Sequence, residues 1–98
     1  MSADPSRALV RALAAYLGPI DDLNVKTRDW SSAMFCGMRH ELTFTVPRTE
    51  QSCAAAAAIA EADLPMTGHF VADVVLVASR DDGTHLRLTI EALTIEDA

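Results

Sequence analysis

Basic residues are scarce in this 98-residue chain: eight lysines and arginines stand against fourteen aspartates and glutamates, for a net charge of -6. Nucleic-acid binding needs a basic surface that replaces phosphate counterions, and anionic membranes attract clusters of lysine and arginine. The composition therefore argues against a nucleic acid or a membrane as the partner. The sequence also contains no phosphate loop, zinc knuckle, EF-hand loop or dinucleotide-binding fingerprint.

Cysteine is equally rare, since only Cys36 and Cys53 are present and their spacing is not CxxC. Disulfide-stapled secreted domains carry a denser cysteine framework, so we expect free thiols and a cytoplasmic location. No apolar stretch approaches the length of a membrane span. Residues 8–17 resemble the core of a signal peptide, but Asp4 precedes them and Arg11 interrupts them. We interpret this stretch as a helix of a folded domain.

Half of the residues are hydrophobic, which favours one folded domain over residues 1–98. The chain resembles itself at an offset of 46 residues, where residues 37–44 (GMRHELTF) align with residues 83–90 (GTHLRLTI). Self-similarity at such a spacing suggests one supersecondary unit used twice. We therefore predict an internal duplication with halves of about 5–46 and 51–92.

Each half begins with a predicted helix. Asp4 is a favourable N-cap, Pro5 suits the first helical position, and Gly18 follows the last turn of the first helix. The second helix is expected to start near Thr49 and to run to about Asp63. Its alanine-rich sequence has a strong helix propensity but offers little apolar area to the core.

A hairpin follows each helix. The second hairpin is predicted from strands at 70–79 and 84–95, with Gly83 in a left-handed turn position. If Arg80 pairs with Thr84, the register places leucines and valines of the two strands opposite each other. The repeat offset then predicts the first hairpin.

That first hairpin has strands at about 25–34 and 38–46 and a turn at 35–37. His40 and the alternate apolar residues after it then point inward. The competing interpretation is one long strand that passes through Gly37 with a bulge there.

These elements predict an α+β fold, a two-layer sandwich of αββαββ order. Two helices are expected to pack on one face of a four-stranded, mostly antiparallel sheet. The order of the strands across the sheet is left open by the sequence.

Ser32 and His40 are the first candidate pair, because the predicted register places them opposite each other on the inward face. A serine beside an imidazole is the minimum for an activated nucleophile, but the sequence provides no orienting acid, oxyanion donor or G-x-S-x-G motif. The favoured interpretation is a buried histidine satisfied by a hydroxyl. His40→Leu is then expected to be neutral or stabilising, since Leu86 is its counterpart in the second half. Trp30 either packs in the core or lines a ligand groove beside this pair.

Asp73 and Glu91 are predicted to face each other on the outward side of the second hairpin, where like charges destabilise a strand pair. A charge ladder with neighbouring arginines is favoured over a metal site or an acid/base dyad. His69 and His85 lie at opposite ends of that hairpin, so one metal ion does not use both. We expect no metal and no cofactor.

Val71, Val75 and Val77 are predicted to point away from the helices and to form an exposed apolar patch. A strand that is apolar on both sides is normally covered on both sides. The sequence therefore favours a non-enzymatic interaction or regulatory module that forms a homodimer, or binds another protein, through these valines. The alternative is a small-molecule-binding protein or small enzyme with a cleft near Trp30 and the Ser32–His40 pair.

Overall fold

A computed structural model describes residues 4–97 of the chain. The elements are, in order, α1 (Pro5–Leu17), β1 (Asp21–Ser31), β2 (Cys36–Pro47), α2 (Glu50–Ala57), the 3₁₀ turn η1 (Ile59–Glu61), β3 (His69–Asp81) and β4 (His85–Glu96). The predicted α+β class, with two helices and a four-stranded antiparallel sheet, is confirmed. Within the described residues, no helix is both long enough and apolar enough to cross a membrane.

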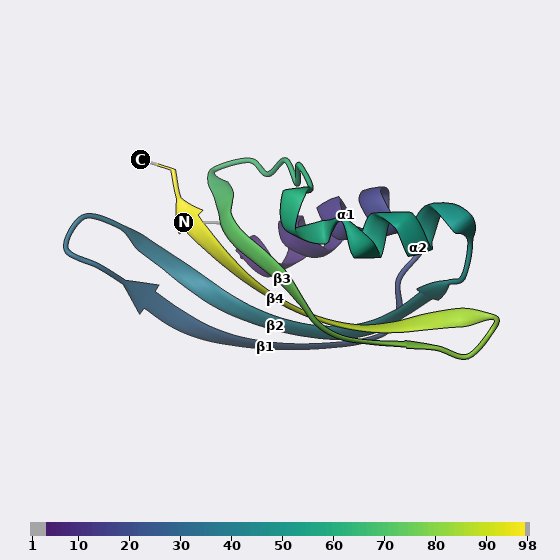
Figure 1. Ribbon diagram of the computed structural model, residues 1–98. Helices are drawn as coiled ribbons and strands as arrows, with labels where there is room; N and C mark the ends of the chain where they lie inside the picture. Colours follow the sequence, from purple (N-terminus) through teal and green to yellow (C-terminus); the bar gives the residue numbers. More distant parts are fainter. Residues whose placement is uncertain (1–3, 98) are drawn as a thin grey trace.

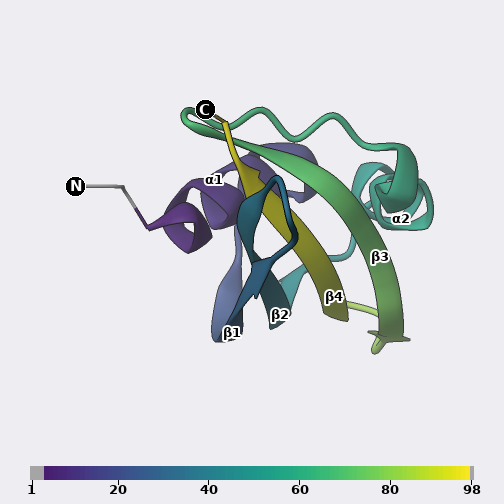
Figure 2. The same cartoon turned by 90° about the vertical axis from the view of Figure 1, so that its left-hand side faces the viewer.

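The two helices lie side by side on one face of the sheet (Figure 1). The strand order is β1-β2-β4-β3, so the second strand of each hairpin lies in the centre and the first strand lies at an edge. Both hairpin turns project beyond the helices, at opposite ends of a molecule that measures 44 × 21 × 21 Å. Figure 2, seen from the end of the β1–β2 turn, shows how the twisted sheet lies beneath the helices. The sheet face away from the helices is called the outer face below.

Helix α1 begins and ends where the sequence predicts. The Asp4 side chain accepts a hydrogen bond from the backbone N–H of Ser6 at 2.9 Å, and Pro5 occupies the first turn. Gly18 ends the helix with a φ of 118°, a conformation that favours glycine. The buried face of the helix carries Leu9, Leu13 and Leu17.

Helix α2 begins with a capping box in which Thr49 and Ser52 exchange side-chain to backbone hydrogen bonds at 2.9 Å. It ends at Ala57, earlier than the predicted end near Asp63, and continues as the 3₁₀ turn η1. The tighter turn brings Ile59 into the core, where it is 2% exposed.

The core lies between the helices and the two central strands. Alternate residues of β2 and β4 point toward the helices and are buried, as predicted for these two strands. The largest apolar contributors from the central strands are Leu42, Phe44, Val46, Leu86, Leu88 and Ile90.

The first hairpin turn lies at Ser32–Phe35, where the Ser32 N–H donates to the Phe35 carbonyl oxygen at 2.8 Å. The turn predicted at 35–37 is therefore misplaced, and the alternative of one continuous strand is also wrong. Gly37 lies within β2, where an added Cβ would overlap the carbonyl oxygen of Thr94 in β4. Glycine is needed there for the close approach of two backbones and not for a turn.

The second hairpin turn contains Gly83 with a φ of 93°, as predicted. The register differs from the prediction, because Arg80 pairs with Arg87 and not with Thr84. The tight turn spans Asp82–His85, and β3 carries two bulges that shift its pairing with β4 along the strand.

Candidate functional site

His40 lies in the core, 2% exposed, and joins α1 to β4 by two hydrogen bonds. Its Nδ1 is 3.0 Å from Oγ of Ser6 in the first turn of α1, and its Nε2 is 2.9 Å from Oγ1 of Thr94. A neutral imidazole has one donor and one acceptor nitrogen, and a hydroxyl serves as either partner. Both ring nitrogens are therefore satisfied.

Ser32 is not a partner of this imidazole. In the register of β1 with β2, Thr27 lies opposite His40, while the Oγ of Ser32 accepts hydrogen bonds from backbone N–H groups of the exposed turn. The predicted Ser32–His40 pair is wrong because the first turn precedes its predicted position. The hydroxyls that satisfy the ring come from α1 and β4, and no local pattern in the sequence connects them to β2.

The Ser6–His40–Thr94 triplet is not arranged for nucleophilic catalysis. A serine activated by histidine needs an accessible hydroxyl and a third group, most often a carboxylate, that orients the ring. Here Ser6 is 9% exposed, and the second ring nitrogen contacts a hydroxyl. Desolvation by burial lowers the pKa of His40 below its ordinary value, more than the charge of Asp4 raises it. The neutral ring therefore serves as a clamp between the helix layer and the sheet.

Trp30 lies near the β1–β2 turn, opposite Gly37, and strand alternation places it on the outer face. A hollow of about 380 Å³ at this end is lined by Trp30 and by Cys36 among others, but not by Ser32 or His40. The three residues predicted to share a cleft thus lie on the outer face, in the turn and in the core. The small-molecule hypothesis has no common cleft to support it.

Two of the three candidate valines are exposed. Val75 is 38% exposed and pairs with Glu91 on the outer face, while Val77 is 54% exposed and is the extra residue of a bulge. The predicted outward orientation of Val71 is wrong, because Val71 pairs with the fully buried Thr94 and packs against the core. The first bulge in β3 shifts the alternation by one residue.

The carboxylate pair on the outer face also differs from the prediction. Asp73 lies opposite Leu93, whereas Glu91 lies opposite Val75 on one side and Glu41 on the other. The predicted Asp73–Glu91 pair is wrong because the true register is shifted by two residues. The pairing of Glu41 with Glu91 depends on the strand order, which the sequence leaves open.

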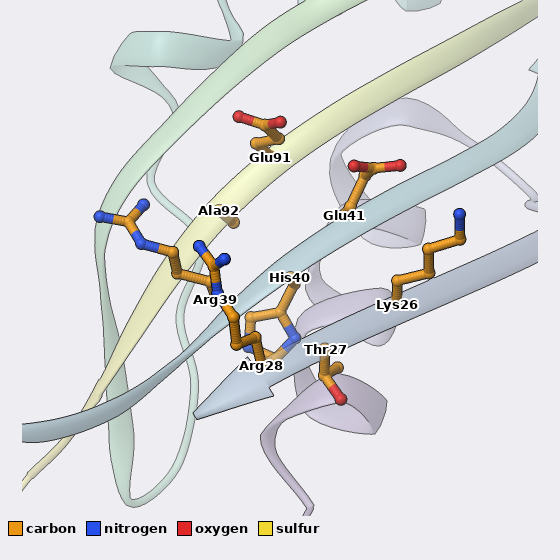
Figure 3. Close-up of a pocket in the computed structure, with 8 residues that line it drawn as sticks. All are labelled: Lys26, Thr27, Arg28, Arg39, His40, Glu41, Glu91 and Ala92. Atoms are coloured by element: carbon orange, nitrogen blue, oxygen red, sulfur yellow. The ribbon is translucent and has the colours of Figure 1, made fainter. Parts of the chain in front are cut away.

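A second pair of like charges lies beside the first, since Arg28 is directly opposite Arg39. Figure 3 shows the side chains of Glu41 and Glu91 next to each other and both guanidinium groups on the same side of the sheet. Like charges directly opposite destabilise a strand pair. Neither pair is relieved by an ion pair, because the one ion pair within residues 4–97 joins other residues, in the loop after β2 and at the end of β3.

These charges surround a hollow of about 540 Å³ over β1, β2 and β4 (Figure 3). The hollow is lined by Lys26, Thr27, Arg28, Arg39, His40, Glu41, Glu91 and Ala92. Its charged lining consists of cations on the β1 side and carboxylates toward β4. The hollow can therefore receive groups of both signs in defined positions.

His69 and His85 begin β3 and β4, at opposite ends of their hairpin. Among the described residues, no three His, Cys, Asp or Glu side chains are placed to hold a metal ion. Cys36 is exposed, Cys53 is half-buried, and both are free thiols.

Comparison with known proteins finds no matching protein family, no matching curated protein and no matching solved structure. The function is therefore inferred from the geometry of this chain alone.

Proposed function

We propose that this protein is a non-enzymatic interaction or regulatory module that forms a homodimer through the outer face of its sheet. The observation that carries the proposal is the apolar surface left on the uncovered side of β3. Val75 and Val77 are 38% and 54% exposed, and Phe70 in the same strand is 45% exposed. Val75 and Val77 lie two residues apart, while Asp73 lies between them and Phe70. An exposed apolar patch on a small domain often marks an association site.

The position of β3 strengthens this proposal. Val74 is 4% exposed on the helix side, while its neighbour Val75 points outward. A strand that is apolar on both sides is normally covered on both sides, and both helices lie on one side only. A second protein layer would complete the sandwich.

We also propose a compartment and a class of partner for this protein. Two free thiols in separate elements suit a reducing compartment such as the cytoplasm. The net charge of -6 favours protein partners over nucleic acid or membrane. Neither a metal nor a cofactor takes part.

An internal αββ duplication remains a prediction within this proposal. The sheet order places the two hairpins symmetrically about the β2–β4 pair, which supports it. The two hairpin turns are 50 residues apart, from Ser32 to Asp82, whereas the sequence echo has an offset of 46. A duplication would thus have to include a change of length within one half.

Val75→Lys tests the proposed contact. A stable homodimer buries roughly 800 Å² per subunit, and a charge within that area should raise the dimer dissociation constant about tenfold or more while the monomer stays folded. Analytical ultracentrifugation measures the constant, and circular dichroism checks the fold. Leu23→Lys is the matched control, because Leu23 is 42% exposed and lines a hollow beside α1. A wild-type protein that sediments as a monomer at high micromolar concentration would contradict the homodimer.

A further inference from the structure

In the rows of the outer face nearer the β1–β2 turn, the charges differ in sign across the width of the sheet. Lys26 and Arg28 lie on β1, at one edge, and Arg39 lies next to Arg28 on β2. Asp73 lies on β3, at the other edge, and Glu91 lies on β4. In this part of the face the β1 side is therefore basic and the β3 side acidic, whereas Arg80 and Arg87 make β3 and β4 basic near the other turn.

The register arranges these residues in two adjacent rows across the four strands. One row runs Arg28, Arg39, Leu93, Asp73, and the next runs Lys26, Glu41, Glu91, Val75. Together the rows hold three cations and three carboxylates. None of these six side chains forms an ion pair within the described part of the chain.

A sheet with this pattern is complementary to a second copy of itself. When two sheets pack face to face about a two-fold axis parallel to the strands, β1 of one copy lies over β3 of the other and β2 lies over β4. Such an axis keeps the position along the strands. Each row then meets the same row of the second copy in reverse order.

The reversed first row brings opposite charges together. Arg28 meets Asp73 of the second copy, and the reverse contact forms at the same time. In the other row, Lys26 meets Val75 of the second copy and Glu41 meets Glu91, so that four carboxylates come together in the centre. Arg39 of the first row lies beside them in both copies. Lys26 and Arg39 of both copies equal these carboxylates in number, and the Arg28–Arg39 pair of each monomer gains a facing partner of opposite sign, Asp73.

The end of the face near the β1–β2 turn fits the same arrangement. The next row runs Trp30, Gly37, Ile95, Phe70. The two-fold axis places Trp30 over Phe70 of the second copy, and Phe70 is 45% exposed in the single chain. Aromatic side chains at the margin of a contact commonly anchor it.

We infer that the outer faces of two copies of this chain pack together about a two-fold axis parallel to the strands, with Arg28 of each copy paired with Asp73 of the other. This inference rests on the proposed homodimer and adds its partner, orientation and charge pairing. The three carboxylates within the face disfavour a phosphate backbone as the occupant.

Charge reversal on each side of the face tests the pairing. Arg28→Glu places an acid over Asp73 of the second copy, and Asp73→Lys places a base over Arg28 of the second copy. Each variant alone should raise the dimer dissociation constant at least about 100-fold, because the two-fold axis creates the unfavourable like-charge contact twice. An equimolar mixture of the two variants should form a heterodimer, since both contacts between positions 28 and 73 again join opposite charges. Native mass spectrometry distinguishes the heterodimer by mass.

Matched controls carry the same charge change on the helix side of the molecule. Arg11→Glu alters α1, Asp63→Lys alters the segment after α2, and both side chains are exposed. Both controls should keep the wild-type dissociation constant within about threefold, because these charges lie outside the contact. Thermal melts of every variant confirm that it is folded before its association is measured.

The outcomes separate the inference from the proposed function. A wild-type dimer, two dissociated variants and a heterodimer in the mixture support the inference. A wild-type dimer that both reversals leave intact, or folded variants that do not form a heterodimer, overturns the pairing and leaves the homodimer in place. A wild-type monomer overturns both.

Discussion

Replacing His40 with leucine removes the imidazole that links α1 to β4 and leaves the hydroxyls of Ser6 and Thr94 without that partner. Thr94 is fully buried and Ser6 is 9% exposed, so water has little access to either hydroxyl. Thr94 retains only a long hydrogen bond from its Oγ1 to the carbonyl oxygen of Met38, at 3.4 Å. The variant should therefore be destabilised.

The magnitude follows from the two hydroxyls. Each buried hydroxyl that loses its partner costs about 1–3 kcal/mol, and the apolar surface of leucine offsets about 1–2 kcal/mol. The net loss should be about 2 kcal/mol, which lowers the melting temperature by roughly 8–16 °C in a domain of this size. The comparison with Leu86 predicts a neutral or stabilising change, but it does not include the hydroxyls that His40→Leu leaves behind.

Urea and thermal denaturation, followed by far-ultraviolet circular dichroism, measure this loss. The triple variant His40→Leu/Ser6→Ala/Thr94→Val should recover most of it, because exchanging all partners for apolar groups of similar shape is nearly neutral. Ser6→Ala keeps the backbone N–H that Asp4 accepts, so the helix cap remains. A single variant as stable as wild type, or a triple variant no better than the single, would refute this reasoning.

The pH dependence gives an independent check on the same residue. Burial lowers the pKa of folded His40, so the unfolded chain binds more protons just below the ordinary value of 6.5. The stability from the neutral ring is fully present above that pH and is lost as the pH falls through the folded pKa. The difference in unfolding free energy between wild type and His40→Leu should therefore shrink below about pH 6.5. A difference that stays constant with pH contradicts this assignment.

Two further predictions concern the hairpins. Gly37→Ala should destabilise the protein by about 2 kcal/mol in urea denaturation, because the new Cβ overlaps the Thr94 carbonyl oxygen and forces two central strands apart; unchanged stability would contradict that close approach. The Asp82 carboxyl should titrate with a pKa of about 2 by NMR, because it accepts hydrogen bonds from the N–H of His85 and from the N–H and hydroxyl of Thr84. Its contribution to stability is present above pH 3.8 and is lost as the pH falls toward about 2, so a measured value near 4 would refute it.

The helix starts were predictable because their signals are local. Asp4 and Thr49 cap the two helices by hydrogen bonds to residues two or three positions later, and Gly18 ends the first helix. The end of α2 at Ala57 was not predictable, because further alanines have the propensity to continue an α-helix. The packing of Ile59 into the core, a tertiary effect, accompanies the change to a 3₁₀ turn.

Glycine gave an ambiguous signal for the turns. Gly83 has a positive φ in a tight turn, whereas Gly37 permits two strands to approach each other closely. Both uses depend on the missing Cβ, and a single sequence does not distinguish them. Assigning Gly37 to the turn displaced the first hairpin and so gave Ser32, rather than Ser6 and Thr94, as the partner of His40.

The inward and outward sides of β2 and β4 followed from alternation, but the neighbours across strands did not. Arg28 faces Arg39 because of the register of the β1–β2 hairpin, and Glu41 faces Glu91 only because the strand order is β1-β2-β4-β3. The same order yields an outer face whose two central rows are neutral as a whole, although the chain carries a net charge of -6.

The excess negative charge of the chain must then lie on the surface outside these two rows. A second copy can pack on the neutral face, while the acidic remainder repels additional copies. A two-fold contact also occupies the same face on both chains. We therefore expect association to stop at the dimer, and sedimentation equilibrium at rising concentration should show no larger species.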